Sequence, residues 1–465
     1  MGKVVNGQKS YVTFINVGII FICSFFFIYT RLVGNLDEAW NYAFARGSVF
    51  RAVPYNDYKT VLPPFFYEMM GLPLHINMSL ITYRITEVII NGFIMTLVYY
   101  SLNKKLSSGL ALATTLLIQV FMDYNVTYNS MLLLFALVLY LIHSSDKEKA
   151  SFTHYFIIGI FAAMPVMFRQ TTGGLMLIFE LVFIFIDRNL PILKKILAFL
   201  CGVSIPCFTL LIYLLVRGNF SGYWDNCFFS LFRVTSQNSS FEISTELIVT
   251  LIIVLASLAV NIYMLVKTSD KNYLYRVFLI ISMVSIGVPI FDPGHIFPAV
   301  VIGVISLIYI YSGKIPKVKN YIVNLAVGLL LLILIVPGTI LALGAEYMTY
   351  SEFSYLPLAF SFEGHEGLNA KNREYEDAGY KVVIVSEAKA DFDVLEGKFE
   401  PPYHFSGMTE PVSYVKGLPD DCIVVISDTY KEDNWQNPPE IYDYVMDNYT
   451  EIDRFGNFGY YTKVK

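Results

Sequence analysis

Three separate parts of the chain carry residues that could do chemistry. Asp37 and Glu38 follow the first apolar stretch, and such carboxylates can accept a proton from a hydroxyl group. Arg169 lies between two apolar stretches, and its guanidinium can donate two parallel hydrogen bonds to a phosphate. Asp292 and His295 precede a later apolar stretch, where ionisable side chains are costly unless they have a partner or a function. Together these residue types predict a general base beside an anion-binding cation.

Each of these residues also has a structural interpretation. The first two carboxylates could be solvated charges of a loop, and the arginine could flank a membrane span. The later Asp–His pair could cap a helix at the membrane interface. Context favours a function for the first pair, because aromatic residues and the turn-forming segments Pro54–Asp57 and Pro63–Pro64 follow it and hold the loop compact.

Eleven apolar stretches must position these residues. A mean hydropathy of +0.54, with 55% hydrophobic and 15% charged residues, excludes an ordinary soluble enzyme. The stretches approach the roughly 20 residues that a helix needs to cross a bilayer. We expect an α-helical polytopic membrane protein with transmembrane helices at 10–32, 79–101, 107–122, 126–143, 153–168, 171–187, 194–216, 246–266, 276–291, 295–312 and 321–344.

The lysines and arginines between the stretches fall mostly on alternate sides, which predicts the orientation of the chain. If the N-terminus is cytoplasmic, the basic loops all return to the cytoplasm. The long loops 33–78 and 217–244 and the C-terminal tail then face outside. We therefore expect a multi-pass protein of the cell membrane whose candidate site lies on the outer face.

The tail differs in composition from the rest of the chain. Residues 346–465 hold 23 acidic and 10 basic residues, whereas residues 1–345 hold 15 and 23. This division does not fit a nucleic-acid binder. We expect a transmembrane domain at 1–345 and a small extracytoplasmic α/β domain at 346–465, which shapes or caps the site. Its predicted elements are strands at 380–386 and 422–427, a helix at 438–449 and a hairpin at 454–464 around Gly456–Asn457.

Local patterns predict further details. Residues 36–48 fit an amphipathic helix in the membrane interface, whose aromatic residues would meet the acyl chains. Arg84 and Glu87 are one helical turn apart and are expected to pair, with contact of Arg84 to a phosphate as the alternative. Histidines other than His295, among them His143, show no pairing and are expected at surfaces. Neither the five cysteines nor the histidines have the spacing of a metal site.

Three segments resemble a known family. The run DEAWNYAFARGSVFRAVPYNDYKTVLPPFFYE at 37–68 resembles the first outer loop of GT-C-fold glycosyltransferases, integral-membrane enzymes that use polyprenyl-phosphate sugars. Members include the protein O-mannosyltransferases and the aminoarabinose transferases of lipid A. FRQTTGG at 168–174 and VPIFDPGH at 288–295 are similar to two further turns of the family. The resemblance covers about residues 1–345 and departs at Arg169, where a lysine is common, and at Lys59, where a neutral residue is usual.

The resemblance implies that Asp37 is the general base of an inverting glycosyl transfer and that Glu38 supports it. The implied partners are a polyprenyl-phosphate sugar, the membrane, and a lipid, glycan or protein acceptor, with no nucleic acid. An Asp–Glu pair could also hold Mg²⁺ or Mn²⁺, although no ligand cluster demands a metal. We expect the donor phosphate to contact Arg169, His295, Arg84 and Lys59, and the substrates to contact Asp57, Tyr55, Gln170 and Asp292.

Two other functions remain open. A transporter or flippase of lipid-linked sugar is the main alternative, but the central parts of the spans are nearly free of charge and no internal repeat is evident. A non-catalytic scaffold that displays the acidic tail is the other, and it would not require Asp37, Arg169 and His295 to converge.

Overall fold

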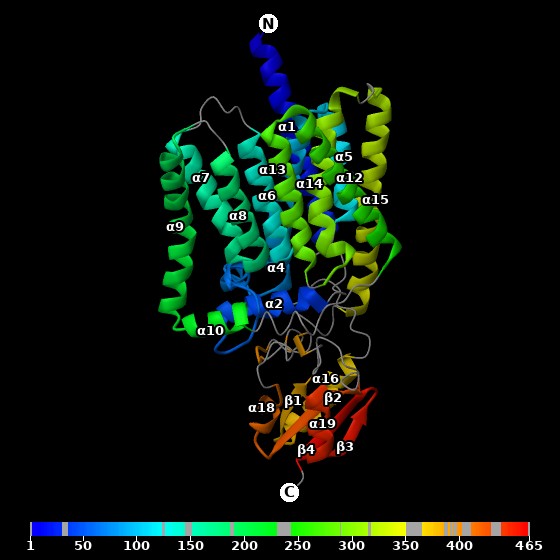
Figure 1. Cartoon of the computed structure of the whole chain (residues 1–465). Helices are drawn as coiled ribbons and strands as arrows, with labels where there is room; N and C mark the ends of the chain where they lie inside the picture. Colours follow the sequence, from blue (N-terminus) through cyan, green and yellow to red (C-terminus); the bar gives the residue numbers. More distant parts are fainter. Residues whose placement is uncertain are drawn as a thin grey trace.

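The computed structural model describes most of the chain as a helical bundle with a small sheet at one end (Figure 1). Side chains are not described at 2–10, 29, 36–37, 338, 341–349, 365–366 and 411. The described residues are 2–29, 36–122, 126–144, 151–186, 190–229, 243–288, 290–314, 318–349, 365–385, 389–390, 393, 398–401, 411–428 and 439–463.

Every predicted span coincides with a helix of the bundle. Within the described residues, six helices are long and apolar enough to cross a membrane, and the number that do cross stays a prediction. The short turns η3 (Met164–Met167), η5 (Ser285–Gly287) and η6 (Ser312–Lys314) follow three of the helices. The helices are α1 (Gly2–Tyr29), α4 (Leu80–Asn103), α5 (Ser108–Phe121), α6 (Tyr128–His143), α7 (Phe152–Ala163), α8 (Gln170–Ile186), α9 (Ile192–Val216), α12 (Thr245–Thr268), α13 (Lys271–Val284), α14 (Pro293–Tyr311) and α15 (Asn320–Thr349).

Side-chain caps fix where several of these helices begin. Ser79 accepts a hydrogen bond from the Thr82 backbone N–H at the start of α4, and Ser244 does the same for Leu247 at the start of α12. Thr127 forms a capping box at the start of α6. Such caps matter here because the first N–H groups of a helix lack partners within it, and hydrocarbon supplies none.

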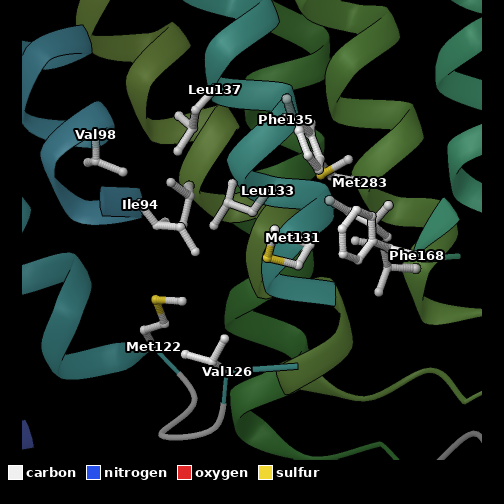
Figure 2. Packing of buried hydrophobic residues seen from close by; sticks show 14 of the residues in the cluster. Ile94, Val98, Met122, Val126, Met131, Leu133, Phe135, Leu137, Phe168 and Met283 are labelled. Atoms are coloured by element: carbon white, nitrogen blue, oxygen red, sulfur yellow. The ribbon is translucent and has the colours of Figure 1, made fainter. Parts of the chain in front are cut away.

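The core of the bundle is built from apolar side chains of several helices. Figure 2 shows Ile94 of α4 beside Leu133 of α6, with Met283 of α13 packed against the other side of α6. Phe168, the residue before Arg169, packs on Phe135, with ring centroids 5.7 Å apart. The outer faces of α9, α12 and α15 expose many large apolar side chains, as expected of surfaces that face lipid.

Short helices gather at one end of the bundle, next to the sheet (Figure 1). We call this the α2 end. It carries the loop elements of the two long predicted outer loops. They are α2 (Leu36–Val49), α3 (Phe65–Gly71), η1 (Pro73–His75), α10 (Phe220–Trp224) and the π-helical turn η4 (Asp225–Phe229).

Helix α2 confirms the helix predicted at 36–48, but the predicted orientation of its aromatic face is wrong. Trp40, Tyr42 and Phe44 are 4%, 1% and 2% exposed and point into the protein. The physical reason is that aromatic side chains of the protein itself lie nearby and pack against this face. The ring centroids of Phe44 and Tyr58 are 5.2 Å apart. The aromatic residues of α2 therefore belong to the core, and Phe50, just beyond its end, is the exposed one.

The C-terminal part forms a four-stranded sheet in the order β1-β2-β4-β3. Strands β1 and β2 are parallel, and β4 pairs antiparallel with both β2 and β3. The two predicted strands and the predicted hairpin, with Gly456 at a φ of 55°, are confirmed. The elements are α16 (His365–Asp377), β1 (Lys381–Val385), α18 (Pro411–Lys416), β2 (Cys422–Ser427), α19 (Pro439–Asn448), β3 (Tyr449–Phe455) and β4 (Phe458–Lys463).

Helices α7 and α9 pack with their backbones in close contact because glycines face each other. A Cβ added to Gly202 would lie 2.0 Å from the Phe156 carbonyl oxygen, and one added to Gly159 would lie 2.2 Å from that of Phe199. No larger residue fits without moving the helices apart.

We predict that Gly202→Ala lowers the free energy of unfolding by roughly 1–3 kcal/mol, because the methyl group overpacks the α7–α9 contact. Thermal unfolding in detergent measures the effect. Gly174→Ala is the control, since no atom lies within 4 Å of the added Cβ and alanine favours a helix. Equal melting temperatures for the two variants would contradict the prediction.

Candidate functional site

Arg169 lies in a turn between η3 and α8 and joins two other parts of the chain. Its Nη1 donates to Oδ1 of Asn129 at 2.8 Å, and its Nη2 donates to the Val288 carbonyl oxygen at 2.8 Å. The guanidinium carbon also lies 5.8 Å from the centre of the Tyr128 ring. The start of α6 and the turn before α14 are thereby held at the same point.

Among the described residues, the buried charge of Arg169 has no negative partner. Its side chain is 8% exposed, and its hydrogen bonds go to neutral oxygens only. Within the described part of the chain, no carboxylate oxygen lies within 4.0 Å of it. A guanidinium has five N–H donors, of which these two bonds use two. Because burying an uncompensated charge is costly, this arrangement favours an anion at the remaining donors.

Gln170, the next residue, ties together the two long outer loops. Its Nε2 donates to the Val61 carbonyl oxygen at 2.9 Å and to that of Cys227 at 2.6 Å. Its buried Oε1 has no hydrogen-bond partner among the residues that the structure describes. Through Arg169 and Gln170, the three segments that resemble the family meet at the α2 end of the bundle.

Three predicted site residues fix the shape of the first outer loop. Tyr55, which is fully buried at a φ of 70°, donates its hydroxyl to the Leu62 carbonyl oxygen at 2.8 Å. Burial raises the pKa of Tyr55 well above its usual value, so it stays a neutral donor. Asp57 Oδ2 accepts the Val53 backbone N–H at 2.6 Å, and the Lys59 ammonium donates to the Tyr55 carbonyl oxygen. These contacts favour a positioning role for all three side chains.

Glu38 and Arg84 form a buried ion pair between α2 and α4. Arg84 Nε lies 3.1 Å from Glu38 Oε1, and Nη2 lies 3.4 Å from Oε2. The sequence predicted Glu87 as the partner of Arg84. Glu87 Oε1 is seen to accept the Val126 backbone N–H at 3.2 Å. The backbone of Asp37 belongs to the same turn of α2 as Glu38, and the Asp37 side chain lies outside the described residues.

Asp292 and His295 are partners at the start of α14. Asp292 Oδ1 accepts the His295 backbone N–H at 2.9 Å and so caps α14, while Oδ2 lies 2.7 Å from His295 Nδ1. Burial raises the pKa of Asp292, but the side chain and backbone of His295 lower it by more. The net shift is downward, and the carboxylate stays ionised beside the imidazole.

The structure corrects the prediction for His143. Its side chain is buried, and Nε2 lies 3.0 Å from Oε2 of Glu180, whose other oxygen accepts the Tyr275 hydroxyl at 2.5 Å. These residues come from α6, α8 and α13. Glu180, an isolated charge within the apolar run of α8, was the sequence signal for this cluster. The partners of Glu180 lie too far away along the chain for residue spacing to reveal them.

Among the residues that the structure describes, no group of three or more His, Cys, Asp or Glu is placed to hold a metal ion. The Glu38 carboxylate is engaged by Arg84. A metal at this end of the bundle therefore stays a prediction that rests on Asp37.

No protein-family model matches the chain, and no curated protein sequence matches it. Solved structures do. ArnT from Cupriavidus metallidurans, bound to undecaprenyl phosphate, aligns at a TM-score of 0.56 and 12% identity over 98% of both chains. The oligosaccharyltransferase of Archaeoglobus fulgidus in its apo form aligns at 0.53 and 13% identity, over 98% of this chain and 75% of that one.

The chain has the GT-C fold. A further structure of the archaeal oligosaccharyltransferase AglB, in complex with an inhibitory peptide and a dolichol-phosphate, aligns at a TM-score of 0.50 and 12% identity, over 98% of this chain and 75% of that one. At such identities the likeness concerns the fold. It agrees with the polytopic helical architecture expected from the apolar stretches.

We predict that Glu38→Gln lowers the free energy of unfolding by about 3–5 kcal/mol, because it removes the charge of one member of a buried ion pair. Unfolding of the purified protein in detergent measures the loss. Asp420→Asn is the control, since it breaks the exposed pair with Lys463 and should change stability little. A Glu38→Gln protein as stable as the control variant would show that the pair does not anchor α2.

Proposed function

We propose that the chain is an integral-membrane glycosyltransferase that moves a sugar from a polyprenyl-phosphate donor to an acceptor. The reaction takes place at the α2 end of the bundle, which faces outside the cytoplasm. The distribution of basic loops supports this orientation. Asp37 is the general base, and the donor phosphate binds at Arg169.

The observation that carries this proposal is the buried guanidinium of Arg169, which has no carboxylate partner among the described residues. A phosphate would neutralise the charge and accept hydrogen bonds from the N–H groups that are not bonded to Asn129 or Val288. His295 is proposed as a second donor to the phosphate, with Asp292 holding its other ring nitrogen. Arg84 and Lys59 remain proposed contacts of the phosphate, although both side chains also have partners within the protein.

The proposed step is a single displacement at the anomeric carbon. Asp37 takes the proton of an acceptor hydroxyl, and the hydroxyl oxygen forms the new bond to carbon. The bond from that carbon to the phosphate oxygen breaks on the opposite side, and its electron pair leaves with the lipid phosphate. Arg169 stabilises the anion that results. Attack and departure on opposite sides invert the anomeric configuration.

The fold supports this choice of donor. The ArnT structure to which the chain is similar was solved with undecaprenyl phosphate, and one AglB structure was solved with a dolichol-phosphate. A polyprenyl chain needs an apolar surface beside the reacting phosphate. The apolar outer faces of the bundle provide one next to the α2 end.

Glu38, Tyr55, Asp57 and Gln170 are assigned positioning roles in this proposal. Glu38 holds α2 on α4, and Gln170 holds the two outer loops together. Tyr55 and Asp57 keep the first loop compact, and their contact with a substrate remains a prediction. Together they fix the backbone on which Asp37 is presented.

A flippase or transporter of lipid-linked sugar is the second candidate. The His143–Glu180–Tyr275 cluster favours it, because buried ionisable side chains inside membrane helices often line a transport path. The two functions differ in their product: a flippase leaves the bond between sugar and phosphate intact.

We predict that Asp37→Asn lowers the rate of sugar loss from the donor by about 10²–10⁴-fold, because it removes the base. The assay supplies membranes with a panel of polyprenyl-phosphate sugars and follows each by mass spectrometry. Asp225→Asn changes an exposed carboxylate at the same end and is the matched control. Size-exclusion chromatography confirms that both variants are folded.

Normal turnover by a folded Asp37→Asn protein would show that Asp37 is not the general base. Consumption of no donor by the wild-type protein, together with movement of intact donor between leaflets, would favour the flippase.

A further inference from the structure

The C-terminal domain contains a polar hollow that the proposed reaction does not use. It is a small hollow that is partly open to solvent. Helix α16 forms one wall, strand β1 forms the floor, and described residues between 389 and 400 form the rim. Val382 and Ile384 supply an apolar patch on the floor.

The charges around the hollow balance. Three of the lining residues are basic and three are acidic. Lys389 Nζ lies 3.0 Å from Asp393 Oδ1, and Lys398 Nζ lies 2.9 Å from Glu376 Oε1. Because basic and acidic side chains are equal in number and two of each are paired, the hollow offers no net charge to an anionic or a cationic ligand.

One buried donor in the wall has no partner. The Asn369 side chain is 4% exposed, and its Nδ2 makes no hydrogen bond to the part of the chain that the structure describes. Leaving such a group unsatisfied is costly. Its neighbour one turn later, Asn372, is satisfied, since its Oδ1 accepts the Tyr460 hydroxyl at 2.8 Å. The orphaned amide therefore indicates a ligand that brings an acceptor.

We propose that this hollow binds a neutral, polyhydroxylated ligand, and that the ligand is a sugar unit of the acceptor. Sugar hydroxyls both donate and accept, so they suit a wall with an amide donor and carboxylate oxygens. The apolar patch of β1 suits the C–H face of a sugar ring. The identification of the ligand as part of the acceptor rests on the proposed glycosyl transfer, whereas binding of a neutral sugar does not.

The rim of the hollow also touches the helix that presents Asp37. The Asp393 carbonyl oxygen accepts a hydrogen bond from Arg46 Nη1 at 3.3 Å, and Arg46 is a buried residue of α2. Phe399 stacks on Phe50 just beyond α2, with centroids 5.5 Å apart. The side chain of Asp393 thus faces the hollow while its backbone contacts α2. A sugar bound there would lie next to a direct contact with the reacting end of the bundle.

The test measures binding to the full-length protein in nanodiscs by saturation-transfer NMR. The probes are methyl glycosides of neutral hexoses and of N-acetylhexosamines, with glucose 1-phosphate and glycine as charged comparisons. We expect at least one neutral glycoside to bind, with a Kd of about 1 mM. Asn369→Ala and Lys398→Met should each weaken it about fivefold or more.

Asn448→Ala and Lys463→Met are the matched controls, since both residues lie outside the hollow in the same domain and should leave binding unchanged. Binding that is equal in all four variants, or absent for every neutral glycoside, would overturn the proposal. A preference for glucose 1-phosphate or glycine would overturn the neutral class. If Asn369→Ala fails to fold, the Lys398→Met result decides. Because no transfer is measured, a failure of the proposed transferase reaction leaves this test intact.

Discussion

Two adjacent side chains hold the α2 end of the molecule together. Arg169 and Gln170 donate hydrogen bonds to the carbonyl oxygens of Val61, Cys227 and Val288, which belong to three different connections of the bundle. Backbone groups of irregular segments near a membrane need such partners, because hydrocarbon offers none. The two residues at the start of α8 therefore provide hydrogen-bond donors to loops that are far apart in sequence. These bonds set the relative positions of the loops.

The site contains two fixed arginines, and they differ in whether their charge is neutralised. Amide and carbonyl oxygens fix the Arg169 guanidinium but do not neutralise it. By contrast, the Glu38–Arg84 ion pair holds the first turn of α2 on α4, and its two charges cancel. A fixed cation and a fixed helix bearing Asp37 lie at one end of the bundle, next to the C-terminal part of the chain, where the Asp393 carbonyl oxygen contacts α2.

Much of the architecture could be predicted from the sequence because its signals are local. Apolar stretches located the long helices of the described bundle, and the turn residues Gly456 and Asn457 located the hairpin between β3 and β4. The alternation of basic loops led us to expect that the short motifs share one face. Helix α16, by contrast, is strongly polar and has no apolar run from which a helix could be predicted.

The partners of buried charges could not be predicted. Spacing suggested Glu87 for Arg84, because it shows only neighbours on one helix, whereas Glu38 comes from a different helix. His143 and Glu180 were missed for the same reason. The aromatic face of α2 was assigned to lipid because tyrosine, tryptophan and phenylalanine suit both an interface and a core. Only the positions of Tyr58, Tyr67 and Tyr83 decide that they are buried.

The most direct test of the account is a cryo-electron microscopy structure of the full-length protein with bound undecaprenyl phosphate. The account predicts that the phosphate lies at the α2 end, within hydrogen-bond distance of the Arg169 guanidinium, with Asp37 facing the same space. A phosphate bound at the opposite end of the bundle, or out of reach of Arg169, would contradict it.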